Sequence, residues 1–76
     1  MPKVEVWKPG RGTNFGLKLG EGQGDKNNDT VTIQTWTTTA GLQAGKTYGL
    51  KVGGVSYAGT AQVPPPHGAA HFTNVE

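Results

Sequence analysis

The chain has 76 residues, 13 of them glycine, and carries seven Lys or Arg against five Asp or Glu, a formal net charge of +2. A folded chain of this size hides only about 60% of the surface that its unfolded form exposes, so nothing large fits inside it. The absence of cysteine excludes disulfides, thiolate metal sites and a cysteine nucleophile. No apolar run approaches the roughly 20 residues that span a bilayer, and the start MPKVEVWK lacks the apolar segment of a signal peptide. We therefore expect one cytoplasmic domain with no membrane partner.

The apolar residues alternate with polar ones and never recur at helical spacing, which indicates an all-β chain. The predicted strands cover residues 3–8, 14–20, 30–37, 46–52 and 55–63. Residues 21–29, EGQGDKNND, have the composition of a long solvated hairpin loop, whereas Gly53-Gly54 predicts a tight turn between the last two strands. We expect little or no helix.

The run PPPHG, residues 64–68, predicts an extended exit from the barrel, because three successive residues have no N–H to donate. Residues 69–76 could then form a short sixth strand, an arm over an exposed edge, or a frayed tail. The sequence thus predicts a β-domain over 1–63, followed by a proline-rich exit and a C-terminal arm over 64–76.

The order of the predicted strands and turns along the chain also bears on the fold. Residues 15–22 contain an aromatic residue, alternating aliphatic residues and a glycine-containing turn, and residues 31–36 form a strand that ends in a tryptophan. Residues 42–48 place a leucine and a glycine before a strand with a tyrosine, and Tyr57 lies in the last strand. This outline, over about residues 3–63, resembles the OB-folds of replication protein A-like and single-strand-binding-protein-like families. The resemblance implies a small five-stranded OB-like barrel that binds single-stranded nucleic acid. A fibronectin-like or immunoglobulin-like β-sandwich is the alternative architecture.

Strand alternation also predicts which side chains face outward. Val31 and Ile33 point to one side of their strand, which sends Trp36 to the polar side. The outer side chains proposed to bind are Lys3, Trp7, Lys18, Trp36 and Lys51. Bases stack on aromatic rings without regard to sequence, and lysines follow the phosphates. We therefore predict non-sequence-specific binding of single-stranded DNA or RNA, with Arg11 and Tyr57 as flanking contacts.

Other interpretations of the two tryptophans stay open. The rings could be buried in a subunit interface or in the core, or could stack on sugars. The corresponding functions are a structural or interaction module, such as a virion decoration or adhesive domain, and a carbohydrate-binding module. Phe15 and Tyr48 are predicted to be core residues, because each shares the register of neighbouring leucines. The thin core favours a homodimer or higher homo-oligomer.

Residues that would support catalysis or metal binding are not arranged for it. His67 and His71 follow prolines and have no third ligand nearby, and the GEGQG run lacks the Lys-Ser/Thr of a phosphate-binding loop. No carboxylate has a histidine at a placeable distance. We expect no enzyme activity, no cofactor and no metal.

Overall fold

The structure, a computed structural model, describes residues 1–10, 15–38, 42–62 and 70–76. Six β-strands make up most of this part of the chain, and none of it forms a helix able to cross a bilayer. The strands are β1 (Lys3–Pro9), β2 (Phe15–Asn27), β3 (Thr30–Thr38), β4 (Thr47–Val52), β5 (Val55–Ala61) and β6 (Ala70–Thr73). The prediction of an all-β fold is confirmed.

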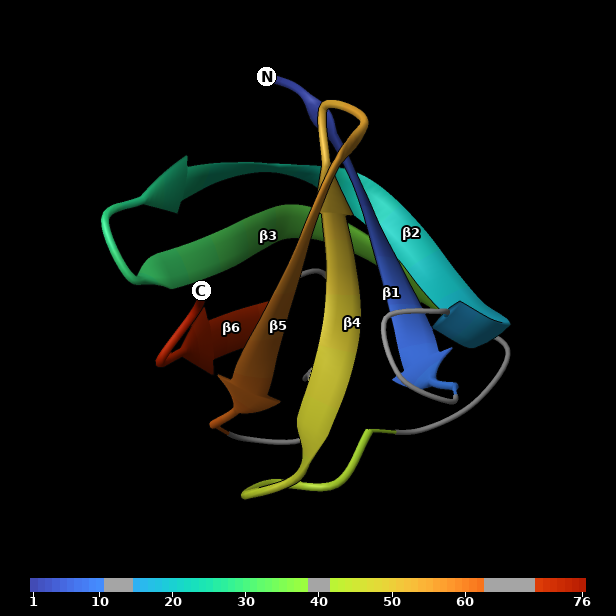
Figure 1. Cartoon of the computed structure of the whole chain (residues 1–76). Helices are drawn as coiled ribbons and strands as arrows, with labels where there is room; N and C mark the ends of the chain where they lie inside the picture. Colours follow the sequence, from blue (N-terminus) through green and yellow to red (C-terminus); the bar gives the residue numbers. More distant parts are fainter. Residues whose placement is uncertain (11–14, 39–41, 63–69) are drawn as a thin grey trace.

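The strands form a closed antiparallel barrel in the order β1-β2-β3-β6-β5-β4, with β4 pairing back onto β1 (Figure 1). The predicted count of five strands is wrong, because the segment 70–73 enters the barrel as β6, between β3 and β5. A closed barrel also rules out the two-sheet sandwich. The architecture is OB-like only in the broad sense of a small, closed β-barrel.

The C-terminal segment is an integral part of the barrel. Phe72 lies opposite Val31 of β3 and has no exposed surface. Beyond β6, the Val75 amide donates to the Asp29 carbonyl, and Glu76 and Ala58 exchange two backbone hydrogen bonds. The barrel therefore extends past residue 63, the boundary that the sequence indicated, and the sixth strand is the correct one of the three alternatives.

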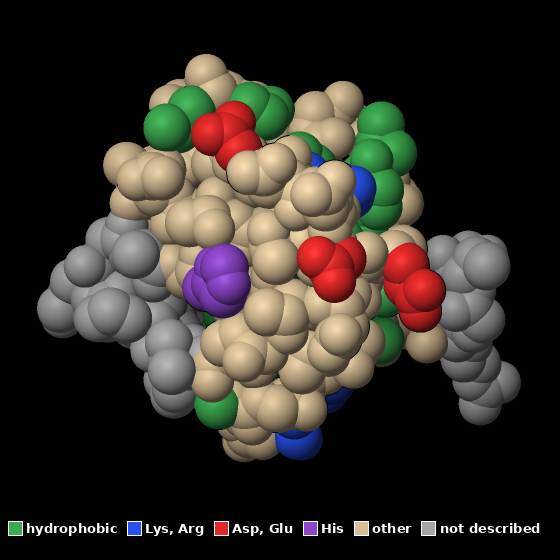
Figure 2. Space-filling view, turned by 90° about the vertical axis from the view of Figure 1, so that its left-hand side faces the viewer, with side chains coloured by type: hydrophobic (Ala, Val, Ile, Leu, Met, Phe, Trp, Pro, Cys, Tyr) green, Lys and Arg blue, Asp and Glu red, His purple; other side chains and the backbone are tan. Residues whose placement is uncertain are grey.

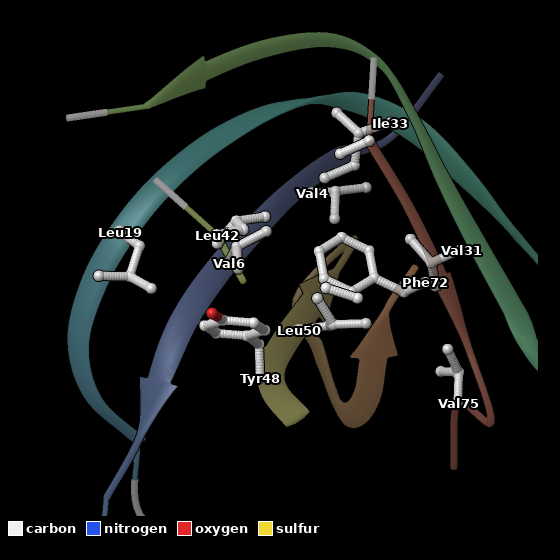
Figure 3. Packing of buried hydrophobic residues seen from close by; sticks show 12 residues of the cluster. Val4, Val6, Leu19, Val31, Ile33, Leu42, Tyr48, Leu50, Phe72 and Val75 are labelled. Carbon is white, nitrogen blue, oxygen red and sulfur yellow. The ribbon is translucent and has the colours of Figure 1, made fainter. Parts of the chain in front are cut away.

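The core fills the inside of this barrel (Figure 3). Its six largest fully buried side chains come from four strands: Val4, Val6, Val31, Ile33, Leu50 and Phe72. Tyr48 is also buried, with 7% of its surface exposed, as predicted. Tyr48 lies with Leu19 and Leu42 at one end of the cluster in Figure 3, and Val75 lies at the other.

The segment predicted as a long loop, 21–29, is mostly strand. β2 continues to Asn27, and only Asn28-Asp29 form the turn before β3, with Asn28 at φ 57°. Its glycines have a packing role, since a Cβ on Gly22 would overlap the Thr35 carbonyl of β3. Glycine here permits close approach of two strands. The predicted β4–β5 hairpin through Gly53-Gly54 is confirmed.

A bulge in β3 reverses the predicted orientation of Trp36. Gln23 lies opposite Thr35, but the next residue, Gly24, lies opposite Ile33, so Gln34 is an extra residue on β3. Gln34 and Thr35 are both exposed, and Trp36 packs partly buried against the core. The prediction of an outward Trp36 is wrong, because it assumed unbroken alternation. The Trp36 Nε1 is buried without a hydrogen-bond partner in the described structure.

β2 contains a similar irregularity. Val6 lies opposite Gly20 and Trp7 opposite Lys18, which makes Leu19 the extra residue. Leu19 is buried, whereas Leu17 is 66% exposed. The register shifts a second time between Trp7 and Pro9, where Gly16 and Leu17 together face Lys8. Phe15, opposite Pro9, therefore lies outside the core cluster. The prediction that Phe15 is a core residue is therefore wrong.

Candidate functional site

One outer face of the barrel gathers most of the residues that the sequence singled out. β1 lies between β2 and β4, and the pairing sets Glu5 opposite both Glu21 and Lys51, and Trp7 opposite both Lys18 and Gly49. We call this surface the Trp7 face. It consists of Lys3, Glu5 and Trp7 of β1, Phe15, Lys18 and Glu21 of β2, and Lys51 of β4.

Two aromatic rings and one ammonium group form the centre of the Trp7 face. The ring centroids of Trp7 and Phe15 are 6.1 Å apart, with a 37° angle between the planes. The Phe15 ring lies on the backbone of Gly49, where an added Cβ would be 2.8 Å from the ring. The Lys51 Nζ lies 4.9 Å from the Trp7 centroid and 5.6 Å from that of Phe15. These are cation–π distances.

The indole of Trp7 is also held at its edge. Its Nε1 donates a 2.9 Å hydrogen bond to the Glu5 carboxylate, two residues earlier on the same strand. Because successive side chains alternate, Glu5 and Trp7 project from the same side of β1. The bond restricts rotation of the indole and leaves the ring partly exposed.

The remaining charges of the Trp7 face are paired across β1 and β2. Lys3 lies 3.5 Å from both Glu5 and Glu21, and Lys18 lies 3.9 Å from Glu5 and also contacts Glu21. Exposed ion pairs of this kind add about 0 to 1 kcal/mol each. Three lysines against two glutamates leave a formal charge of +1. Within the described structure, Lys51 is the lysine of this face without a carboxylate partner.

These contacts change proton affinities. The hydrogen bond from Trp7 and the nearby Lys18 and Lys3 ammonium groups lower the pKa of Glu5 below 4.5. The bond from Lys18 likewise lowers the pKa of Glu21, and the same bond raises the pKa of Lys18. The face therefore keeps its alternating charges throughout the neutral range.

The lowered pKa of Glu5 predicts an acid transition at Trp7. A carboxyl whose folded pKa is depressed stabilises the protein above its unfolded pKa and loses that effect as pH falls through the folded pKa. In a Trp36→Phe variant, where Trp7 is the sole tryptophan, fluorescence should change with a midpoint below pH 4.5, the ordinary value for Glu5. Adding Glu5→Gln should remove this transition. A midpoint at or above 4.5 would contradict the Trp7–Glu5 contact.

Other predicted site residues lie elsewhere. Tyr57 lies opposite Leu50 and is partly buried against the core, with the Lys26 Nζ 4.9 Å from its ring centroid. Trp36 packs against the core, and Arg11 lies outside the described residues. The structure thus unites Trp7 with the three predicted lysines, and it separates them from both Trp36 and Tyr57.

Sequence reasoning gave no binding role to three members of the Trp7 face. Glu5 was detectable, since it alternates with Lys3 and Trp7 on one strand. The composition of residues 21–29 predicts a loop for Glu21, and unbroken alternation with Leu17 and Leu19 predicts a core position for Phe15. The two register shifts between β1 and β2, at Leu19 and between Lys18 and Phe15, have no clear signal in the sequence.

The side of the molecule that carries the β2–β3 hairpin has a different character. Figure 2 shows that this side is mostly backbone and uncharged side chains of the other types, with separate acidic side chains, a histidine, hydrophobic side chains near its edges and little lysine or arginine. The His71 Nδ1 and the Thr32 Oγ1 are 3.0 Å apart and form a hydrogen bond. Among the described residues no three His, Cys, Asp or Glu side chains are grouped as a metal would require.

Comparisons with family models, with curated proteins and with solved structures found no match to this chain. The inference of function therefore rests on the geometry and charge of the Trp7 face.

Proposed function

We propose that the barrel binds single-stranded DNA or RNA without sequence preference, on the Trp7 face. The observation that carries the proposal is the group formed by Trp7, Phe15 and Lys51, with Lys51 Nζ 4.9 Å from the indole centroid. Bases would stack on the rings, and the ammonium group would contact the phosphates. This is the mode of binding that the resemblance to single-strand-binding OB-folds implies.

The free energies of the two contacts favour a stacked base over the Lys51 ammonium group as the neighbour of the Trp7 ring. An exposed cation–π contact contributes about 0.5 to 1 kcal/mol, whereas base stacking on an aromatic contributes about 1 to 3 kcal/mol. A base can therefore displace Lys51 from the ring. The lysine side chain is long and flexible, so its ammonium stays within reach of the backbone that accompanies the base.

The ion pairs set the expected strength of binding. Lys3 and Lys18 must exchange contacts with Glu5 and Glu21 for contacts with phosphates, and those carboxylates repel the phosphates. The proposed surface consequently has modest affinity with a shallow salt dependence. The proposed surface does not include Trp36 or Tyr57, which pack against the core, and the prediction for Arg11 lies outside the described residues.

A second candidate function is a protein-interaction module that uses the same face. The alternation of Lys3, Glu5, Lys18 and Glu21 around two aromatic rings favours it, since both signs of charge suit a complementary protein surface. Homo-oligomer formation through this face would be one case. The closed barrel adds no support for an oligomer from exposed strand edges, because each of its strands has a paired neighbour on both sides.

A titration with three ligands separates the candidates. The Trp36→Phe variant, which leaves Trp7 as its reporter, is titrated with oligo-dT, a DNA duplex and a soluble glucan at two salt concentrations. We expect quenching by oligo-dT that weakens as salt rises, and little response to the other two ligands. Equal response to glucan and oligo-dT would favour sugar stacking. No response to any ligand would contradict the proposal and favour the protein-interaction module.

A further inference from the structure

A cavity of about 310 Å³ opens at the end of the barrel where β1 finishes and β4 begins. Its apolar lining comes from Pro9, Leu19 and Tyr48, and two lysines, Lys8 and Lys46, also line it. This volume lies at the lower end of the range for small-ligand pockets, and an apolar lining with a few polar groups is their usual composition.

The charges of this cavity are of one sign. All five acidic residues of the chain are described, and none of them lines the cavity. Lys8 and Lys46 are exposed, and no carboxylate pairs with either in the described structure, whereas Lys3 and Lys18 are both paired. Two ammonium groups without counter-charges at one opening favour an anionic ligand.

The apolar wall is preformed. The backbone amide of Gln43 donates a 2.9 Å hydrogen bond to the Tyr48 hydroxyl, which fixes the ring. The ring centroids of Tyr48 and Phe72, in the core, are 6.4 Å apart. The favoured ligand therefore combines an apolar body with an anionic group. A nucleotide has both.

The cavity continues the Trp7 face. Pro9, on the cavity wall, lies opposite Phe15 and two residues beyond Trp7 on β1. Two residues of a strand span about 7 Å, which is the reach of one extended nucleotide unit. A single-stranded nucleic acid with one base stacked on Trp7 and Phe15 would therefore reach the cavity with its next nucleotide.

We infer that this cavity holds one nucleotide unit of the bound strand, with its base or sugar against Pro9 and Tyr48 and a phosphate between Lys8 and Lys46. The inference rests on the proposed function of the Trp7 face. The phosphate belongs either to an internal phosphodiester or to a strand terminus.

The test compares salt dependence in matched variants. Binding of fluorescein-labelled oligo-dT of about ten nucleotides, with either a 5′-hydroxyl or a 5′-phosphate, is followed by anisotropy from about 50 to about 200 mM salt. The Lys8→Gln/Lys46→Gln double variant is compared with Lys26→Glu, which removes the same net charge at the β2–β3 hairpin. Thermal unfolding verifies that each variant is folded.

Loss of the lysine contacts to this one phosphate should make the slope of log affinity against log salt less negative by about 0.7 in the double variant, and should leave the slope for Lys26→Glu unchanged. Tighter binding of the 5′-phosphate oligonucleotide, lost in the double variant, assigns the cavity to a terminus; equal binding assigns it to an internal phosphodiester. A double variant that matches Lys26→Glu overturns the inference and leaves the proposed function intact. No binding by the unaltered protein means that the proposed function has failed, and the inference with it.

Discussion

Replacing Trp7 by alanine should weaken oligo-dT binding about 5- to 150-fold, the factor that corresponds to loss of about 1 to 3 kcal/mol of stacking. The indole lies on the outer face, so its removal takes away the ring contact to Phe15, the cation–π contact from Lys51 and the hydrogen bond to Glu5, and no core packing. Anisotropy of a labelled oligonucleotide measures the affinity without depending on tryptophan fluorescence. Trp7→Phe, which keeps a ring for stacking, should restore part of the binding.

The second tryptophan supplies the matched control. Trp36 packs against the core, so Trp36→Ala should lower the unfolding temperature while leaving the affinity of the folded protein nearly unchanged. Measurements at a temperature where this variant is folded separate the two effects. If Trp36→Ala weakens binding as much as Trp7→Ala, the stacking surface is not the Trp7 face.

Replacing Phe72 by alanine should destabilise the barrel by about 3 to 5 kcal/mol, the usual cost of removing a fully buried phenylalanine. At roughly 0.05 to 0.15 kcal/mol per residue, the whole chain of 76 residues has only about 4 to 11 kcal/mol of stability. The variant should therefore be close to unfolding in the absence of denaturant. Urea unfolding followed by circular dichroism gives the value.

Phe15→Ala is the same substitution on the outer face. It should cost little stability, because Phe15 lies outside the core cluster, and it should weaken oligo-dT binding. The two phenylalanines thus separate folding from binding. Equal destabilisation by both substitutions would show that Phe15 belongs to the core and not to the outer face.

Strand alternation was sufficient where the strands have no extra residue. On β1 it places Val4 and Val6 inside and Lys3 and Trp7 outside, and on β4 it places Leu50 inside, as found. The Gly53-Gly54 turn was also evident, because few sequences other than paired glycines favour two successive residues of positive φ. Local rules sufficed for these elements.

The failures come from bulges and from contacts across the barrel. The extra residue Gln34 on β3, and a second extra residue on β2 between Lys18 and Phe15, each reverse the inside–outside order beyond them. They explain why Trp36 lies inside and Phe15 outside, against the expectation from alternation. The β6 strand is only four residues long, and it is held by Phe72 in a core built from distant segments. The pairing of Lys3 and Lys18 with Glu21 depends on the register between strands, which composition does not determine.

The position of β6 between β3 and β5 has a consequence for how the chain folds. Val31 and Phe72, partners in this closure, are separated by 41 positions, so the ring is completed by a contact that is remote along the sequence. Such non-local topologies fold slowly, on timescales of milliseconds to seconds, because the entropy of ordering the intervening chain is lost before the contact forms. Until β6 docks, the backbone groups of β3 that it covers are open to pairing with another molecule, so slow docking of β6 lengthens the time during which the nascent barrel is prone to aggregate.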